Sequence, residues 1–227
     1  SGSEIVHGGK AKENSLLYMV PLQNRSGQHF CGEFLIRKDI VVSAAHCAEG
    51  FSVTHAVLGT HNLSKPGLRL NIAKKHLNPT YRGIEHGSDI MVLQLAGNAR
   101  LDNTIQTIPL PRSAMNIKEC QVAGWGLTES GNPVANLRFV DVSIIMPQLC
   151  KDKWPGLPAN VICAGGYDTM KGFCQGDSGG PLVCSGVAVG VVSFNKNKNC
   201  HYPHVPNVYT DIKKYLPWIN SILSASE

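Results

Sequence analysis

The 227-residue chain is 43% hydrophobic and 16% charged, which excludes an intrinsically disordered protein and is enough for one large all-β unit or two small domains with substantial cores. Its longest apolar runs, such as Gly186–Phe194, have the length of a strand and are far too short to span a membrane. The formal net charge of +5 is compatible with a sulfated glycan as partner, but ordinary solvated lysines explain it more simply, and no motif indicates nucleic acid.

Short β-type runs separated by Gly, Pro, Asn and Ser predict strands along the whole chain. In the first half these runs are Leu17–Leu22, Phe34–Ile36, Ile40–Ser43, Ala56–Leu58, Leu68–Ala73 and Ile90–Leu95. In the second half they are Gln121–Ala123, Leu137–Ile145, Val161–Ala164, Pro181–Val183, Val187–Phe194 and Asn207–Tyr209. So many short strands favour β-barrels or a β-sandwich. Ala96–Ser113 has few strand signals, so we expect it to connect the two halves.

Helical periodicity is clearest at the C-terminus, where apolar residues recur at Ile212, Tyr215, Leu216, Ile219, Ile222 and Leu223. Pro217 is tolerated only in a first turn, so the regular helix is expected at about 216–224, with its apolar side packed on a barrel. Ala44–Cys47 is expected to form a single helical turn.

Eight cysteines, an even number, indicate an oxidising compartment and four disulfides. No Cys-x-x-Cys pair occurs, which weakens a zinc or thioredoxin-type interpretation. Sequons at Asn24 and Asn62 fit a secreted glycoprotein. No signal peptide is present, so any such segment was removed or omitted, and Ser1–Ser3 reads as a cloning scar or a prosegment remnant.

Gly176–Pro181 places the hydroxyl of Ser178 among glycines that let the backbone bend sharply and approach a ligand. Such a stretch is either a polar turn or the site of a nucleophile, and a serine nucleophile needs a base. His46 follows an apolar run and is held by Cys47, which makes it the candidate base. Asp89 directly precedes the apolar run that starts at Ile90, so its carboxylate can be partly buried beside an imidazole.

The chain resembles the chymotrypsin-family serine proteases from Ile5 to its end, because four motifs occur in the family's order: Ala44–Cys47 (AAHC), Asp89–Leu93 (DIMVL), Gly124–Gly126 (GWG) and Gly176–Pro181 (GDSGGP). Ile5–Gly9 is similar to the family's mature N-terminus, and Tyr18–Val20 with Cys31–Ile36 resembles the granzyme and mast-cell granule protease branch.

The resemblance implies an all-β fold of two six-stranded antiparallel barrels with the active site between them and a short C-terminal α-helix. Residues 1–4 would be the remnant or scar, and residues 5–227 the protease domain. The N-terminal barrel would cover about 17–106 and the C-terminal barrel about 107–210.

The resemblance also implies the catalytic roles. Ser178 would attack the scissile carbonyl, His46 would carry the proton, and Asp89 would fix the imidazole tautomer. The backbone N–H groups of Gly176 and Ser178 would form the oxyanion hole. All eight cysteines would pair, as Cys31–Cys47, Cys120–Cys184, Cys150–Cys163 and Cys174–Cys200, and the last of these bridges points to granzymes that retain it.

In the family, a new α-amino group at the position of Ile5 pairs with the acid that corresponds to Asp177 and so sets the oxyanion hole and the pocket. Here Ser1–Glu4 is still attached, so the nitrogen of Ile5 is an uncharged amide. We expect a proenzyme, although a tag would look the same. Glu4 resembles the end of the short activation peptides that a dipeptidyl peptidase removes.

The family's primary substrate pocket falls on residues that carry no charge: Gly172, Phe173, Ser193, Phe194, Asn195 and Asn207. An acid at Gly172 would select Lys or Arg, so trypsin-like cleavage is not expected. Asn195 and Asn207 are larger than the common glycines, and Phe173 either narrows the pocket floor or packs away from it. We expect a restricted pocket for Met, Leu or Val, with large aromatic side chains as a less favoured option. A pocket that stays blocked until a partner binds is a further alternative.

No cofactor and no metal are expected, because Gly59–Arg69, at the family's calcium loop, contains no Asp or Glu. The predicted function is a secreted or granule-stored endopeptidase, active as a monomer on proteins or peptides and controlled by protease inhibitors. The competing interpretation is a catalytically silent, protease-like protein that binds glycans or microbes. Inactive relatives usually lose a triad residue, and this chain retains all three, which favours the enzyme.

Overall fold

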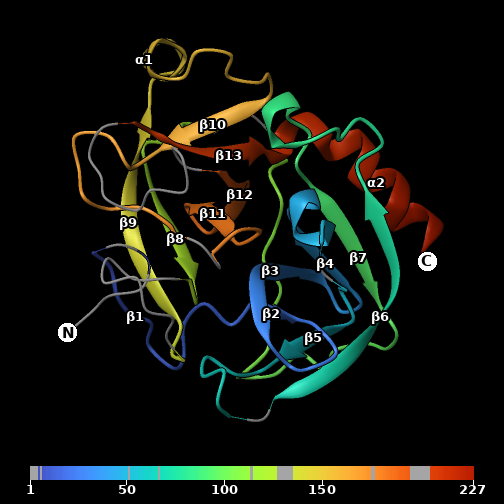
Figure 1. The fold of residues 1–227 in the computed structure, drawn as a ribbon. Helices are drawn as coiled ribbons and strands as arrows, with labels where there is room; N and C mark the ends of the chain where they lie inside the picture. Colours follow the sequence, from blue (N-terminus) through green and yellow to red (C-terminus); the bar gives the residue numbers. More distant parts are fainter. Residues whose placement is uncertain are drawn as a thin grey trace.

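In the computed structural model, the described residues are 5, 7–50, 52–65, 67–112, 115–126, 135–174, 177–194 and 205–227. The first half of the chain closes into an antiparallel barrel, shown beside the second barrel in Figure 1. The strands around this first barrel are β2 (Met19–Gln23), β3 (His29–Arg37), β4 (Ile40–Ser43), β7 (Met91–Leu95), β6 (Leu68–Leu77) and β5 (His55–Leu58).

The second half forms a second antiparallel barrel, which the pairing of β8 with β9 closes. Its strands run in the order β9 (Arg138–Ile145), β10 (Val161–Ala164), β13 (Asn207–Asp211), β12 (Val187–Phe194), β11 (Pro181–Cys184) and β8 (Glu119–Gly124). The short strand β1 (Gly9–Lys10) pairs with β9 from outside the barrel. The predicted fold of two six-stranded barrels is therefore confirmed.

Strands with continuous apolar sequence were the most predictable. Every residue of β4 is buried, because one face of the strand lines the first barrel and the other is covered by the rest of the molecule. The predicted bounds of β4, β10 and β12 match the structure. Helix α1 (Pro147–Lys153) was not predicted, since its only buried residue is Cys150 and it has no apolar stripe.

The C-terminal helix α2 (Leu216–Ala225) follows the 3-10 turn η4 (Ile212–Tyr215), and Pro217 lies in its first turn as predicted. Its buried residues, Ile219 and Ile222, pack into the core of the first barrel. Burying two such side chains contributes about 1.5–3 kcal/mol each. The helix therefore fixes the C-terminus against the N-terminal barrel (Figure 1).

Three disulfides join the cysteines as the resemblance implied: Cys31 to Cys47, Cys120 to Cys184, and Cys150 to Cys163. The pairing of Cys174 with Cys200 stays a prediction, because Cys200 lies outside the described residues.

None of the helices among the described residues combines the length and apolarity needed to cross a bilayer.

One charged residue lies deep in the first barrel. Glu33, on β3 opposite Val20 of β2, is fully buried, and neither carboxyl oxygen has a hydrogen-bond partner among the described residues. Burial raises the pKa of Glu33 well above its usual value, because a carboxylate is poorly solvated there. Burial therefore favours the neutral acid form of Glu33 in the folded protein.

Replacing Glu33 by Gln should change the free energy of unfolding in favour of the folded state, and this gain should be about 1–3 kcal/mol larger at pH 8 than at pH 5. The folded wild type keeps the Glu33 proton while the unfolded chain releases it, so wild-type stability falls as pH rises above the ordinary glutamate pKa. Gln cannot ionise and removes this loss. Urea unfolding at both pH values measures the difference. Replacing the exposed Glu119 by Gln is the matched control, and an identical pH dependence in Glu33→Gln and wild type would contradict the prediction.

Candidate active site

His46 lies in the 3-10 turn η1 (Ala45–Ala48), directly after β4, and the disulfide from Cys47 to Cys31 fixes this turn to β3. The backbone N–H of His46 donates to Oδ1 of Asp89 over 2.8 Å, and its ring Nδ1 lies 2.6 Å from Oδ2. Because an ionised carboxylate only accepts, Nδ1 carries the proton and Nε2 is left as a base. The two residues, 43 positions apart, form one rigid unit.

Asp89 is 1% exposed, and further groups hold it in place. The Ser193 hydroxyl donates to Oδ2 of Asp89 over 2.6 Å, and the Thr210 hydroxyl donates to its main-chain oxygen over 2.8 Å. Ser193 was predicted as a pocket residue, and its bond to Asp89 was not foreseen. A serine near the end of the buried strand β12 is a polar group that needs a partner, which is the only sequence signal for this contact.

Ser178 lies in a tight turn whose main chain is held on both sides. Its carbonyl oxygen accepts a hydrogen bond from the N–H of Gly32 over 2.8 Å. Gly32 follows Cys31, which forms a disulfide with Cys47, the residue after His46. Gly179 has φ 86°, and a Cβ there would collide with the carbonyl of Gly32 and the hydroxyl of Ser43. Only glycine fits this position, and the contacts with Gly32 and Ser43 place the turn that carries Ser178 against strands β3 and β4 of the first barrel.

Asp177 is fully buried and accepts two backbone hydrogen bonds of 2.8 Å, one from Gly126 on Oδ1 and one from Cys174 on Oδ2. Burial raises the pKa of Asp177 to about 7, and these two bonds oppose the rise only partly. A Cβ on Gly124 would collide with Oδ1 of Asp177. Ile5 is also fully buried, in the core of the second barrel. Both residues of the predicted switch are therefore inside the molecule.

The family model described as Trypsin matches residues 5–219. The chain is 37% identical to trypsin from Sus scrofa over 230 residues, which cover 98% of this chain and 97% of that protein. The chain belongs to the trypsin family of serine proteases. It is also 38% identical to the chymase of Cavia porcellus, over 98% of this chain and 92% of that protein. Mast cell protease 2 of Ovis aries is 38% identical, over 97% of this chain and 91% of that protein.

This trypsin-family protease is therefore a serine endopeptidase. Two of its predicted site residues, Gly176 of the oxyanion hole and Asn195 of the pocket, lie outside the described residues. Among the described residues, no group of three or more His, Cys, Asp or Glu gathers where a metal ion could bind.

The predicted pocket residues of the protease come from β12, β13 and the segment before the nucleophile. Phe173 is 3% exposed, and its ring packs edge-on against Tyr209 at 5.3 Å between centroids. Asn207 is fully buried, and neither polar atom of its side chain has a hydrogen-bond partner among the described residues. Phe194 packs edge-on against Trp154 at 5.2 Å. Gly172 is buried. None of these residues carries a charge.

The two sequons of the protease lie in surface turns. Oδ1 of Asn24 accepts the backbone N–H groups of Ser26 and Gln28, and Oδ1 of Asn62 accepts that of Ser64. Both asparagines are partly exposed, as glycosylation requires, and their modification stays a prediction.

Proposed function

We propose that this serine endopeptidase cleaves peptide bonds through Ser178, His46 and Asp89, with the backbone N–H groups of Gly176 and Ser178 as the oxyanion hole. The observation that carries the proposal is the pair of hydrogen bonds from His46 to Asp89, of 2.8 and 2.6 Å. They orient the imidazole so that Nε2 is the ring nitrogen that accepts a proton. The contact between Ser178 and Gly32 supports the placing of the nucleophile next to that ring.

In the first step, Oγ of Ser178 bonds to the scissile carbonyl carbon while its proton passes to Nε2 of His46. The carbonyl oxygen becomes an oxyanion, which the two backbone N–H groups stabilise. The C–N bond then breaks, the amine leaves with the proton from Nε2, and an acyl-enzyme remains. Water repeats the sequence and releases the acid. Asp89 stabilises the imidazolium in both halves, and the Ser193 hydroxyl fixes Asp89.

The proposed pocket is neutral and restricted, and it prefers Met, Leu or Val at the P1 position of the substrate. The uncharged lining supports neutral side chains, and the full burial of Asn207 supports a small pocket. The edge-on contact of Phe173 with Tyr209 supports the alternative in which this ring packs into the core and bounds the floor from behind.

We expect the processed enzyme to cleave after Met, Leu or Val at least about 100-fold faster in kcat/KM than after Lys or Arg, because burying an ammonium group without a carboxylate costs several kcal/mol. A peptide library that varies only P1 measures this ratio. Asn207→Asp places a carboxylate in the pocket and should raise cleavage after Lys and Arg. Asn98→Asp makes the same charge change at a site outside the pocket and should leave the profile unchanged. Preferred cleavage after Lys or Arg by the wild type would refute the proposed pocket.

We further propose that the chain with Ser1–Glu4 attached is a proenzyme. The raised pKa of Asp177 supports this, because among the described residues no cation compensates the buried carboxylate, and the nitrogen of Ile5 is an amide. The disulfides and sequons support a secreted or granule-stored protein that a dipeptidyl peptidase activates and protease inhibitors control. We propose a monomer.

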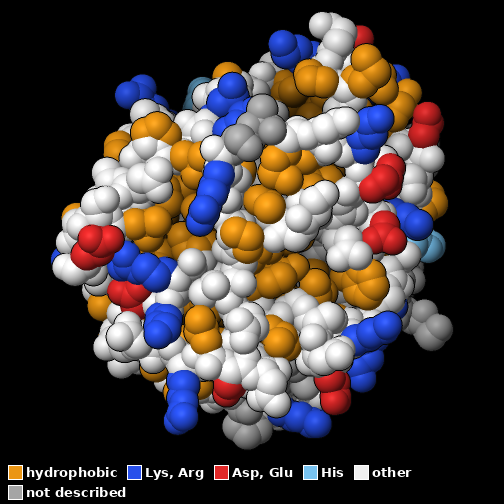
Figure 2. Space-filling model, turned by 180° about the vertical axis from the view of Figure 1, so that it is seen from behind, with side chains coloured by type: hydrophobic (Ala, Val, Ile, Leu, Met, Phe, Trp, Pro, Cys, Tyr) orange, Lys and Arg blue, Asp and Glu red, His pale blue; other side chains and the backbone are white. Residues whose placement is uncertain are grey.

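The alternative is a catalytically silent protein that binds sulfated glycans or microbes through its positive charge. Figure 2 shows Lys and Arg side chains spread singly over the face it draws, with apolar and acidic side chains between them. Such a distribution favours solvated lysines over a polyanion site on that face.

A fluorophosphonate probe separates the two functions, because it reacts only with a serine that a neighbouring base has activated. After Ser1–Glu4 has been removed, the probe should label the folded chain at Ser178, and Ser178→Ala should abolish labelling. A folded, processed chain that takes up no probe would favour the binding protein.

A further inference from the structure

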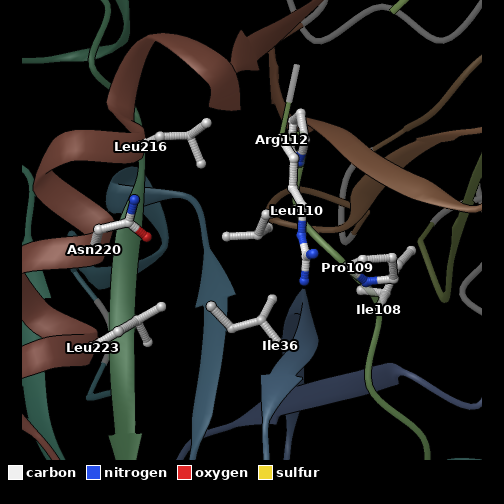
Figure 3. A pocket seen from close by; sticks show the side chains of 9 residues that line it. Ile36, Ile108, Pro109, Leu110, Arg112, Leu216, Asn220 and Leu223 are labelled. Atoms are coloured by element: carbon white, nitrogen blue, oxygen red, sulfur yellow. The ribbon is translucent and has the colours of Figure 1, made fainter.

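A groove of about 470 Å³ lies away from the candidate active site, between helix α2, the segment that connects the two barrels, and the end of β3. Figure 3 shows Leu216, Asn220 and Leu223 on the helical side, with Ile36 and Leu110 facing them. None of the proposed catalytic or pocket residues lines it. The groove therefore needs an explanation of its own.

The helical wall is a second face of α2. Leu216, Asn220 and Leu223 follow one another at spacings of four and three residues, which places them on one side of a helix. The first face, with Ile219 and Ile222, already packs on the first barrel. Leu216 and Leu223 are partly exposed, so this side of the helix has apolar surface that the chain itself does not fully cover.

The opposite wall is an extended segment in which prolines interrupt the series of backbone N–H donors. Ile108, Leu110 and Arg112 line the groove in alternation with Pro109 and Pro111, which have no N–H to donate. The N–H of Ile108 donates to Leu35, and the carbonyl of Pro109 accepts from Ala188. In the described part of the chain, the main chain of Leu110 makes no hydrogen bond. A second main chain that reached these two groups would therefore displace no hydrogen bond of the described residues.

The charge of the groove comes from Arg112. Its side chain is exposed, forms no ion pair with the described residues, and in Figure 3 reaches along the groove past Leu110 toward Ile36. The guanidinium of Arg37, next to the groove, already has partners within the protein: it pairs with Asp39 at 2.7 Å and donates to the carbonyl of Leu223 at 2.9 Å. The guanidinium of Arg112 is a fork of donors that fits a carboxylate.

We propose that this groove docks an extended peptide segment of a partner protein, with apolar side chains against Leu216 and Leu223 and a carboxylate on Arg112. The apolar walls match alternate side chains of such a peptide, the main chain of Leu110 matches its backbone, and Arg112 complements its charge. An acyl chain with a carboxylate would match the walls and Arg112 but would leave Leu110 and the Asn220 carboxamide without partners. Docking in this groove is independent of the proposed catalytic function.

Fluorescence anisotropy with a labelled, capped peptide of alternating Leu and Asp tests the proposal on the full chain, in a Ser178→Ala background that cannot cleave it. Binding should saturate, and Arg112→Glu should weaken it at least about tenfold, since a charge-assisted hydrogen bond is lost and a like charge is introduced. Arg100→Glu changes another exposed arginine and should leave affinity unchanged. In the processed chain with Ser178, from which Ser1–Glu4 has been removed, Arg112→Glu should not alter turnover of a small peptide substrate.

NMR shift changes should fall on Ile36, Leu110 and α2. Equal binding by Arg112→Glu, equal binding of a probe with Lys in place of Asp, or no saturation of the folded protein at millimolar probe would each overturn the proposal. Shift changes centred on Ser178 would assign the peptide to the substrate cleft instead. Dodecanoate that binds with the same dependence on Arg112 while the peptide does not would assign the groove to an acyl chain.

Discussion

Replacing Ser178 by Ala should lower kcat of the processed enzyme by roughly 10⁴–10⁶-fold, because no other group can form the acyl-enzyme. His46→Ala should cost about as much, and the double variant should lose little more, since the two residues act in one step. Steady-state kinetics on a single peptide substrate, corrected for folded protein by circular dichroism, measures the loss.

The control for the serine variant is Ser221→Ala, which removes an exposed hydroxyl from α2 and should leave kcat unchanged. A residual kcat of Ser178→Ala within about tenfold of wild type would place the nucleophile elsewhere. Loss of activity in His46→Ala without loss in Ser178→Ala would also place it elsewhere, since the base would then serve another group.

Cutting the chain before Ile5 should raise kcat/KM by roughly 10²–10³-fold, the amount that an oxyanion hole is worth. The new α-amino group can pair with the carboxylate of Asp177, which is buried and accepts hydrogen bonds from the backbone N–H groups of Gly126 and Cys174. Asp177→Asn keeps the shape but cannot form the ion pair, so the cut variant should stay near the activity of the uncut chain. Cleavage is verified by N-terminal sequencing, and activity is measured before and after it.

Stability against pH reports the same switch without catalysis. The folded pKa of Asp177, about 7, lies above the ordinary value of 3.8, so the uncut chain should lose stability as pH rises from about 4 to about 7. Asp177→Asn should remove about 2–4 kcal/mol of this loss, and cutting before Ile5 should remove it as well. Asp141→Asn, at an exposed site, is the control. An uncut Glu33→Gln chain that keeps Asp177 and is as stable at pH 7 as at pH 4 would contradict a buried, uncompensated Asp177.

The strands were predictable where burial covers both faces, as in β4 and β12. The two-residue strand β1 carries no pattern, and α1 is too short and polar to show a helical period. Glu33 shows a deeper limit. In a strand with one face in solvent, a glutamate beside Phe34 reads as exposed, and only the closed barrel around it shows that both faces of β3 are buried.

The candidate site was predictable as a set of residues but not as a geometry. His46, Asp89 and Ser178 follow from four motifs in family order, whereas their spacing alone says nothing of contact. The bond from Ser193 to Asp89 spans 104 residues, and that from Thr210 to Asp89 spans 121, so neither can be seen before the barrels are assembled. The same holds for Gly179, whose need for glycine depends on Gly32 and Ser43 of the other barrel.

Ser178 should become a reactive nucleophile only when Ile5 becomes the N-terminus. Active-site titration with a fluorophosphonate, on one preparation sequenced before and after removal of Ser1–Glu4, measures this dependence. After removal, we predict that close to one Ser178 per chain is labelled. Before removal, the rate of labelling should be less than about one-hundredth of the rate after it. Full labelling of a chain that still carries Glu4, or none of a folded chain that starts at Ile5, would contradict the coupling of Ile5 to Ser178.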